Sequence, residues 1–321
     1  MPTVGDYQII DAHIHLVRDT EQEKVVFPRR GWPDSWYWCS PGKIGPYMAQ
    51  AGATHVVALN ILATVRMIEQ RMAKLPKGTP EKEAVAARQT AKVEMQDRVR
   101  KFNDWICDTH KKDPRIIPFV LVDPVLFGPD SLKELERSVA RGAMGAKLHP
   151  RNCRHMPDHR DLMPVYEYCQ RTSLPVLTDT NPYGGKGAED ENGVPYGWPS
   201  HWGPILSNFP KLRFIMAHFC DMQWDEKEEL ARRFKDNLWF DMSGGWTDEH
   251  HPPHTHGCMP ADQVVRAFRR VGVERMFFGA DAPGAGMSIL QAASQIVGQP
   301  FTEQEKRMIL GENAKRFFGL T

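Results

Sequence analysis

Two histidines that are two residues apart, His13 and His15, follow an apolar run near the start of the chain. The run from Tyr7 to Ile10 predicts a buried strand, and residues two apart in a strand point to the same face of its sheet. Both imidazoles could therefore reach one divalent cation, for which histidine is the commonest ligand. Such a pair is weak evidence by itself, because two polar residues at a strand end give the same pattern.

Later apolar runs also end in residues that can bind a metal or transfer a proton. Each has a simpler interpretation: Asp281 could start a turn, Asp179 could cap a loop, and Lys147 could form a surface salt bridge. If the strand ends meet on one rim, however, His and Asp side chains converge there with open coordination positions, which is the arrangement of a catalytic divalent metal. The residues concerned are His13, His15, Lys147, His149, Asp179, His218 and Asp281.

Eight apolar runs, each followed by helical sequence, must position these side chains. Because the runs are continuous rather than alternating, they predict strands buried on both faces. Eight such units in 321 residues predict an α/β fold, a (β/α)8 TIM barrel forming one domain over residues 1–321. A doubly wound open sheet is the alternative, but no glycine fingerprint follows the first strand. The expected strands are 7–10 with its continuation to 15, 54–60, 115–122, 142–149, 174–179, 212–218, 238–242 and 275–281.

Helices are expected between these strands and at the end of the chain. In the longest, Met95, Val99, Phe102 and Ile106 follow one another at helical spacing. The expected helices are 41–51, 80–112, 131–141, 161–172, 202–208, 225–235, 260–271, 287–296 and 302–318.

Composition is that of an ordinary globular protein, with 41% hydrophobic and 25% charged residues. The formal net charge of +1 gives no electrostatic case for binding nucleic acid or a membrane. We expect neither a signal peptide nor a transmembrane helix. Six cysteines without a Cys-x-x-Cys pattern favour reduced thiols in a cytoplasmic protein. A homodimer is expected from base rates alone.

The segment from Leu16 to Ser40 is rich in aromatic and basic residues and has no clear period. We expect a loop that walls a substrate pocket and offers an arginine to a carboxylate, although a surface loop or an interface patch fits as well. The residues proposed to touch substrate there are Arg29, Arg30 and Trp38.

Two further groups are expected to be secondary to the chemistry. Four histidines after the seventh strand predict a flexible rim loop more than a tight metal site. Three cysteines near the rim are expected to be buried rather than nucleophilic, because a reactive thiolate needs an electropositive setting. These residues are His250, His251, His254 and His256, and Cys39, Cys220 and Cys258.

Several of these motifs together resemble the amidohydrolase superfamily, and most closely its branch of aminocarboxymuconate semialdehyde decarboxylase-like metal-dependent hydrolases. The resemblance spans the whole chain. It implies a barrel, a divalent metal held by His13, His15 and Asp281, and a catalytic role for His218. The motifs are Asp11-Ala12-His13-Ile14-His15, Gly145-Ala146-Lys147-Leu148-His149-Pro150, His218, Phe278-Gly279-Ala280-Asp281-Ala282-Pro283 and the closing residues 311–318.

One position departs from that family, whose fifth strand usually ends in a metal-ligating histidine. Here the matching residue is Asp179. A carboxylate also binds zinc or manganese, so we expect Asp179 to be a fourth ligand. Weakened or lost metal binding is a second interpretation, and a two-metal site bridged by a carbamylated Lys147 ranks last.

These observations predict a metal-dependent hydrolase that acts on a small organic acid, amide or lactone through a metal-activated water. The metal is expected to be a single divalent ion, zinc first and manganese second. Asp281 would take the water's proton and His218 would act as general acid–base, while Lys147 and His149 would help to bind a carboxylate substrate. Non-oxidative decarboxylation or hydration on the same metal is the alternative, and a non-catalytic metal-binding scaffold is the third hypothesis.

Overall fold

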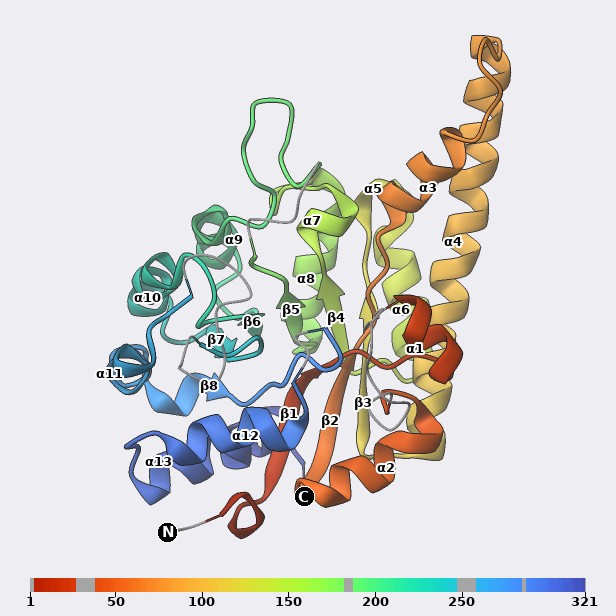
Figure 1. Ribbon diagram of the computed structural model, residues 1–321. Coiled ribbons are helices and arrows are strands. Elements are labelled where there is room, and N and C mark those ends of the chain that lie inside the picture. Colours follow the sequence, from red (N-terminus) through yellow and green to blue (C-terminus); the bar gives the residue numbers. More distant parts are fainter. Residues whose placement is uncertain (1–2, 27–37, 182–186, 247–257, 285–286, 321) are drawn as a thin grey trace.

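Eight parallel strands form one sheet whose spatial order follows the chain. The computed structural model describes residues 3–26, 38–181, 187–246, 258–284 and 287–320 (Figure 1). The strands are β1 Ile9–Ile14, β2 Ala53–Leu59, β3 Ile116–Leu121, β4 Gly145–Leu148, β5 Val176–Thr178, β6 Phe214–Met216, β7 Leu238–Asp241 and β8 Met276–Phe277. Apart from two intermediate residues in β2 and one in β7, every strand residue is buried, as expected for strands covered on both faces.

The sheet closes on itself where the segment after β8 meets β1. Ile14 forms a parallel bridge with Ala282. The amide of Asp281 donates to the carbonyl of His13 over 2.8 Å, and the amide of His15 donates to the carbonyl of Ala282 over 2.7 Å. This closure confirms the predicted (β/α)8 barrel over the open doubly wound sheet.

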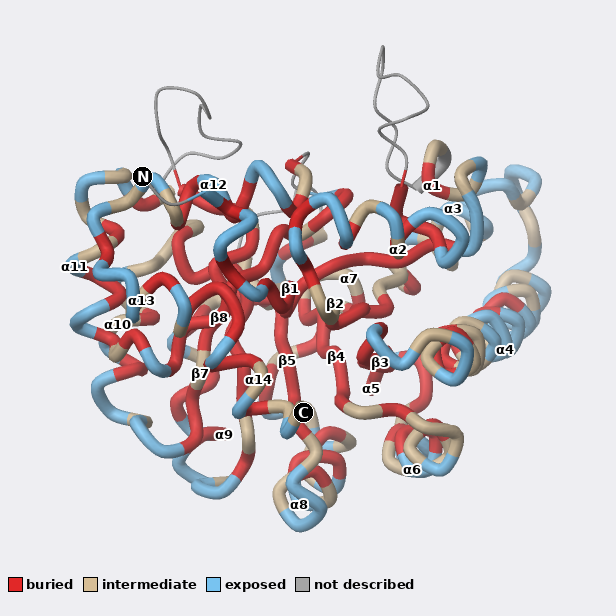
Figure 2. The backbone as a smooth tube through the Cα atoms, turned by 90° about the horizontal axis from the view of Figure 1, so that it is seen from below, coloured by how far each residue is buried: buried red, intermediate tan, exposed pale blue. Residues whose placement is uncertain are grey.

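Helices surround the strands and carry most of the exposed backbone, as the burial colours show (Figure 2). Their apolar sides pack on the barrel, so the two largest clusters of buried apolar residues include strand residues. The helices are α1 Thr20–Val26, α2 Pro41–Gln50, α3 Thr64–Met72, α4 Glu81–Lys112, α5 Pro124–Phe127, α6 Ser131–Arg141, α7 Pro150–Cys153, α8 Met163–Thr172, α9 Gly203–Asn208, α10 Trp224–Arg233, α11 Ala261–Val271, α12 Ile289–Gly298, α13 Glu303–Arg307 and α14 Asn313–Phe318.

Several elements differ from the sequence-based expectation. Helices α1, α3, α5 and α7 were not predicted, and α1 lies inside the segment that was expected to be one long loop. The expected helix 302–318 is interrupted by a π-helical turn at Met308–Glu312. Strand β8 is shorter than predicted and ends at Phe277, after which the chain hydrogen-bonds to β1 and to His15.

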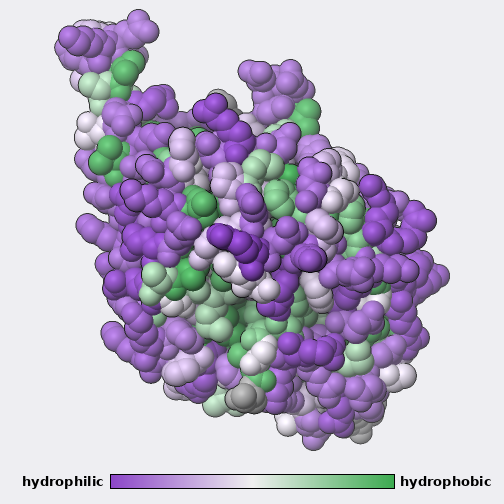
Figure 3. All heavy atoms as spheres, turned by 180° about the vertical axis from the view of Figure 1, so that it is seen from behind, coloured by the Kyte–Doolittle hydropathy of each residue, from purple (hydrophilic) through white to green (hydrophobic). Residues whose placement is uncertain are grey.

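Helices α3 and α4 extend past the barrel and form a projecting arm, whose outer end is mainly hydrophilic (Figures 1 and 3). In the described part of the chain, no helix combines the length and apolarity needed to cross a membrane. Of the three cysteines that were expected to be buried near the rim, Cys39 and Cys220 are buried and Cys258 is half-buried.

Candidate metal centre and active site

His13 and His15 lie at the carboxyl end of β1, at buried positions of one face. The Nδ1 of His13 is 2.9 Å from Oδ2 of Asp241. Because a carboxylate only accepts, Nδ1 carries the ring proton and Nε2 is left with a lone pair. That Nε2 is buried and has no hydrogen-bond partner among the described residues.

Like His13, His15 has a hydrogen-bond acceptor at its Nδ1. Its Nδ1 lies 3.0 Å from the carbonyl oxygen of Leu59, which can only accept a hydrogen bond. Its Nε2 lies 3.0 Å from Oδ1 of Asp281, a contact that is a hydrogen bond when Nε2 carries a proton. A cation bound between the two groups would replace that proton, and Nε2 of the Nδ1-protonated ring would then offer it a lone pair.

The ligand atoms of His13, His15 and Asp281 all lie within 4.8 Å of one another. Burial lowers the pKa of His13 to about 4, so this imidazole is neutral at neutral pH. Burial would raise the pKa of Asp281, but its hydrogen bond to His15 and the nearby histidines lower it to about 2. Once a cation replaces the proton on Nε2 of His15, two imidazole nitrogens and a carboxylate converge as three electron-pair donors, and a divalent cation fits the chemistry of this set.

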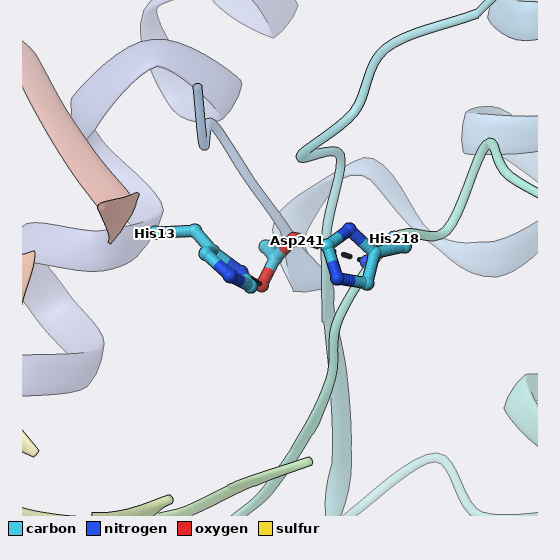
Figure 4. Close-up of side chains that lie close together, drawn as sticks. All are labelled: His13, His218 and Asp241. Atoms are coloured by element: carbon cyan, nitrogen blue, oxygen red, sulfur yellow. Dashed lines mark hydrogen bonds and ion pairs between the residues drawn. The ribbon is translucent and has the colours of Figure 1, made fainter. Parts of the chain in front are cut away.

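Asp241 lies between His13 and His218 (Figure 4). These three residues form a second group whose candidate ligand atoms lie within 4.8 Å. The Asp241 carboxylate already accepts from His13, from the His218 amide at 3.1 Å and from the Ser243 amide at 3.0 Å. Although burial opposes ionisation, His13 and these hydrogen bonds hold the pKa of Asp241 well below its usual range. Its contacts are those of a carboxylate that orients the histidines.

His218 follows β6 and has a left-handed backbone, with φ 62°. Its carbonyl accepts a hydrogen bond from the buried amine of Lys227. Its Nδ1 faces the carbonyl of Ser243 at 3.2 Å and the Ser243 hydroxyl at 2.9 Å, and that hydroxyl gives its own proton to Asp241. Its Nε2 lies 3.3 Å from Oδ2 of Asp179.

Both ring nitrogens of His218 therefore face acceptors, which favours the doubly protonated imidazolium. Burial alone would lower the pKa of His218, but the hydrogen bond to Asp179 and the charge of Asp281 raise it to about 9. The ring centroid is 4.9 Å from that of His13. The site thus places a charged proton donor beside the candidate metal ligands.

Asp179 lies after β5 among basic side chains. Its Oδ2 is 3.3 Å from His218, 3.8 Å from His149 and 3.9 Å from Arg151. Its Oδ1 accepts from the amide of Asn181 at 3.3 Å, which is the loop-capping contact considered as an alternative. Among the described residues, Asp179 belongs to neither of the two groups of converging ligand atoms, and its role as a fourth ligand stays a prediction.

Lys147 and His149 come from the end of β4 and are buried. Burial lowers the pKa of Lys147, while Asp179, Asp241 and Asp281 oppose that effect. The buried Nδ1 of His149 has no hydrogen-bond partner among the described residues. Both side chains thus lie at the same rim as the metal ligands, where a polar substrate could meet them.

Of the remaining predicted substrate residues, the structure describes Trp38. Trp38 is 6% exposed and its ring stacks on that of Tyr47 in the core, so its contact with substrate stays a prediction. The residues that fall outside the described ranges are Arg29, Arg30, His250, His251, His254 and His256.

Sequence reasoning did not single out Asp241, Ser243 or Arg151. Asp241 lies within an apolar run, and its polarity there was the available signal. Asp11 was quoted as part of a motif without a role. Its buried Oδ1 accepts from the amides of His13 at 2.9 Å and Ala280 at 3.1 Å, and it thereby ties β1 to the segment after β8.

Comparison with known proteins gives one family and many structures. The family model described as Amidohydrolase matches residues 10–320. No curated protein matches the chain. An uncharacterised TIM-barrel protein from Bordetella bronchiseptica is 18% identical, with a TM-score of 0.68, covering 98% of this chain and 99% of that one.

Two further solved structures are enzymes by name. A dihydroxybenzoic acid decarboxylase from Polaromonas, with bound manganese and 2-nitroresorcinol, is 18% identical with a TM-score of 0.66, covering 98% of this chain and 97% of that one. The 5-carboxyvanillate decarboxylase from Sphingomonas paucimobilis is 14% identical with a TM-score of 0.64, covering 98% and 99%. At these identities the likeness concerns the fold.

Proposed function

This chain belongs to the amidohydrolase family, and on that premise we propose that it is a metal-dependent decarboxylase of a small hydroxylated aromatic carboxylate. The observation that carries the proposal is His218, whose two ring nitrogens face the acceptors of Ser243 and Asp179. Non-oxidative decarboxylation needs a proton donor for the carbon that loses carbon dioxide, and an imidazolium supplies one. Decarboxylation, which ranked second from the sequence, thus becomes the first hypothesis.

His13, His15 and Asp281 would hold the metal, with Lys147 and His149 beside it. Nitrogen and oxygen ligands of this kind suit zinc or manganese. When bound, the metal would polarise the oxygen substituents of the substrate. The named decarboxylases of dihydroxybenzoate and carboxyvanillate, one of them with manganese, support this substrate class.

The chain's own residues would then carry the proton. Nε2 of His218 gives its proton to the ring carbon that bears the carboxylate, and the bond to the carboxylate breaks as carbon dioxide leaves. Asp179 balances the charge of the imidazolium before transfer, and solvent then restores the lost proton. Lys147 would help to hold the anionic substrate in the buried site.

Hydrolysis is the second candidate, and one observation favours it. Asp281 is ionised and its side chain is 17% exposed, so it could accept a proton from an attacking water. Its pKa of about 2 makes it a weak base, however, whereas the acceptors at both ring nitrogens of His218 support the role of a proton donor. For this reason we rank hydrolysis below decarboxylation.

Product analysis in deuterium oxide tests the proposal. The manganese- or zinc-loaded protein is incubated with hydroxybenzoates and, separately, with aryl amides and lactones. We expect carbon dioxide release and one deuterium on the ring carbon that carried the carboxylate. Ring opening or amine release without carbon dioxide would instead establish the hydrolase, and bound metal without turnover of either panel would contradict both.

A further inference from the structure

A cavity of about 680 Å³ opens directly beside His15. One wall is formed by the ends of β1 and β2 and the residues that follow them, including Leu59 and Leu62. The opposite wall is helix α4, which runs along the barrel and past the strand ends (Figure 1). The cavity therefore leads from the candidate metal ligands to a surface that the proposed reaction does not use.

Helix α4 contributes six residues to this wall, the acidic Glu94 and Asp97 and a stripe formed by Arg98, Lys101, Phe102 and Trp105. Their spacing of three, one and three places them on one face of the helix. The rings of Phe102 and Trp105 are stacked, with centroids 5.6 Å apart and 17° between their planes. The stripe thus combines an aromatic surface with two cationic side chains.

The acidic residues of the same cavity are already paired with cations that do not line it. Glu94 makes a bidentate contact with Arg71. Asp97 lies 3.1 Å from Arg100. Arg18, the third cation of the lining, lies 3.1 Å from Asp19.

Arg98 and Lys101 differ from these residues. Within the described ranges, neither forms an ion pair or a side-chain hydrogen bond, and both are exposed. After the paired charges cancel, two positive charges remain on the α4 wall of the cavity. Such a site attracts an anionic group, which arginine can bind in a bidentate manner.

We infer that this cavity binds a second anionic group of the substrate, so that the substrate is an aromatic compound with two acidic groups. One carboxylate would lie at the candidate metal centre beside His15, the aromatic body would lie against Phe102 and Trp105, and the other acidic group would reach Arg98 and Lys101. The inference rests on the proposed function for the fate of the first carboxylate. The recognition of the second group depends only on α4.

Binding measurements that need no turnover test this inference. Isothermal titration of the manganese-loaded full chain compares terephthalate with benzoate, and a naphthalene dicarboxylate with the matching naphthoate. We expect a dicarboxylate to bind about tenfold more tightly than its monocarboxylate, the lower end for hydrogen bonds to charged groups.

The double variant Arg98→Gln, Lys101→Gln should abolish this preference and leave monocarboxylate affinity unchanged. Arg88→Gln, Lys92→Gln is the matched control, because these residues lie on the same helix outside the cavity lining. Arg98→Lys, with Lys101 intact, should retain most of the preference, and circular dichroism should show all variants folded.

Two results would overturn the inference: equal affinities for both acids of each pair in the wild type, or a preference that survives the double variant. Failure of the proposed decarboxylation has a different outcome. The dicarboxylate preference and its loss in the double variant would persist, while no carbon dioxide would form from any substrate.

Discussion

The imidazole of His218 faces an acceptor at each ring nitrogen, and this geometry leads to the first prediction. His218→Asn removes the proton donor and keeps a polar side chain of smaller size. Turnover should fall by about 10² or more, the usual contribution of acid–base catalysis. Metal content, measured by plasma mass spectrometry, should stay the same, because the His13, His15 and Asp281 set is intact.

His110→Asn is the control for that substitution. His110 is a partly buried histidine at the end of α4 whose Nδ1 bonds the carbonyl of Ile116 at 2.7 Å. This control should keep near-native turnover. Near-native turnover of His218→Asn would contradict the assigned role, and loss of metal would reassign His218 as a ligand.

Asp179 raises the pKa of His218, so its charge should shape the pH profile. Where the protonated imidazole is required, the rate falls as pH rises through the pKa of His218, about 9. Asp179→Asn removes the charge that raises this pKa and leaves burial, which lowers it. The high-pH limb of the rate profile should therefore move to lower pH by about 1 unit or more.

The same position tests the fourth-ligand prediction. If Asp179 binds the metal, Asp179→Ala should lose metal affinity by a large factor, whereas Asp179→His should retain it. If Asp179 instead caps the loop through Asn181, both variants should cost about 1 kcal/mol of stability and leave metal affinity unchanged. If Asp179→Asn leaves the high-pH limb in place and Asp179→Ala leaves the metal content unchanged, Asp179 neither raises the pKa of His218 nor binds the metal.

At the residue scale, the sequence predicted which residues lie at the rim better than it predicted which of them bond to one another. The alternation of strand residues was enough to place His13 and His15 together, and strand ends were enough to place His218 and Asp179 nearby. It could not assign Asp241, because the partner of this carboxylate, His13, is 228 residues away in the chain. Which ring nitrogens of the rim histidines carry protons depends on such long-range contacts.

The π-helical turn at Met308–Glu312 packs against the bottom of β1 and β8. A Cβ on Gly311 would lie 2.3 Å from the carbonyl oxygen of Gln8, so only glycine fits this approach. Two carbonyls near β8, those of Val273 and Met276, accept from Asn313 at 2.7 and 2.9 Å. The closing motif of the sequence thus seals the end of the barrel opposite the site.

Gly311→Ala should consequently lower the free energy of unfolding by about 1–3 kcal/mol, the usual cost of overpacking. Gly298→Ala is the matched control, because a Cβ there would meet nothing within 4 Å. Urea denaturation followed by circular dichroism measures both variants. Equal stability of the two variants would show that the turn can relax away from Gln8.

At the element scale, continuous apolar runs identified all eight strands, and helical spacing identified α4. The short helices α5 and α7, of four residues each, offer too little sequence for a period to emerge. Strand β8 was overestimated because apolar sequence continues past Phe277, while the backbone there pairs with β1 instead of β7. Propensity does not specify which neighbour a strand pairs with.

The barrel joins the two ends of the chain, and the candidate metal centre lies at that junction. His13 and His15 belong to β1, whereas Asp281 follows β8 and donates its amide to His13. Asp281 also has a left-handed backbone, with φ 49°, that the surrounding structure must hold in place. The number of strands was predictable from the sequence, but the closure that brings these ligands together is a property of the whole fold.

Because only the closed barrel assembles these ligands, metal should bind the folded state and not the unfolded chain. Mass action then predicts that metal at about 100 times its dissociation constant adds about 2.7 kcal/mol of stability. Removing the metal with a chelator should lower the melting temperature by several degrees, and adding manganese or zinc back should restore it.

The double variant His13→Ala, His15→Ala should lose this metal-dependent increment in stability and the bound metal itself. The increment is the quantity to compare, because deleting a buried imidazole lowers stability by itself. His110→Ala, far from the rim, should keep the full increment, and an undiminished increment in the double variant would place the metal elsewhere.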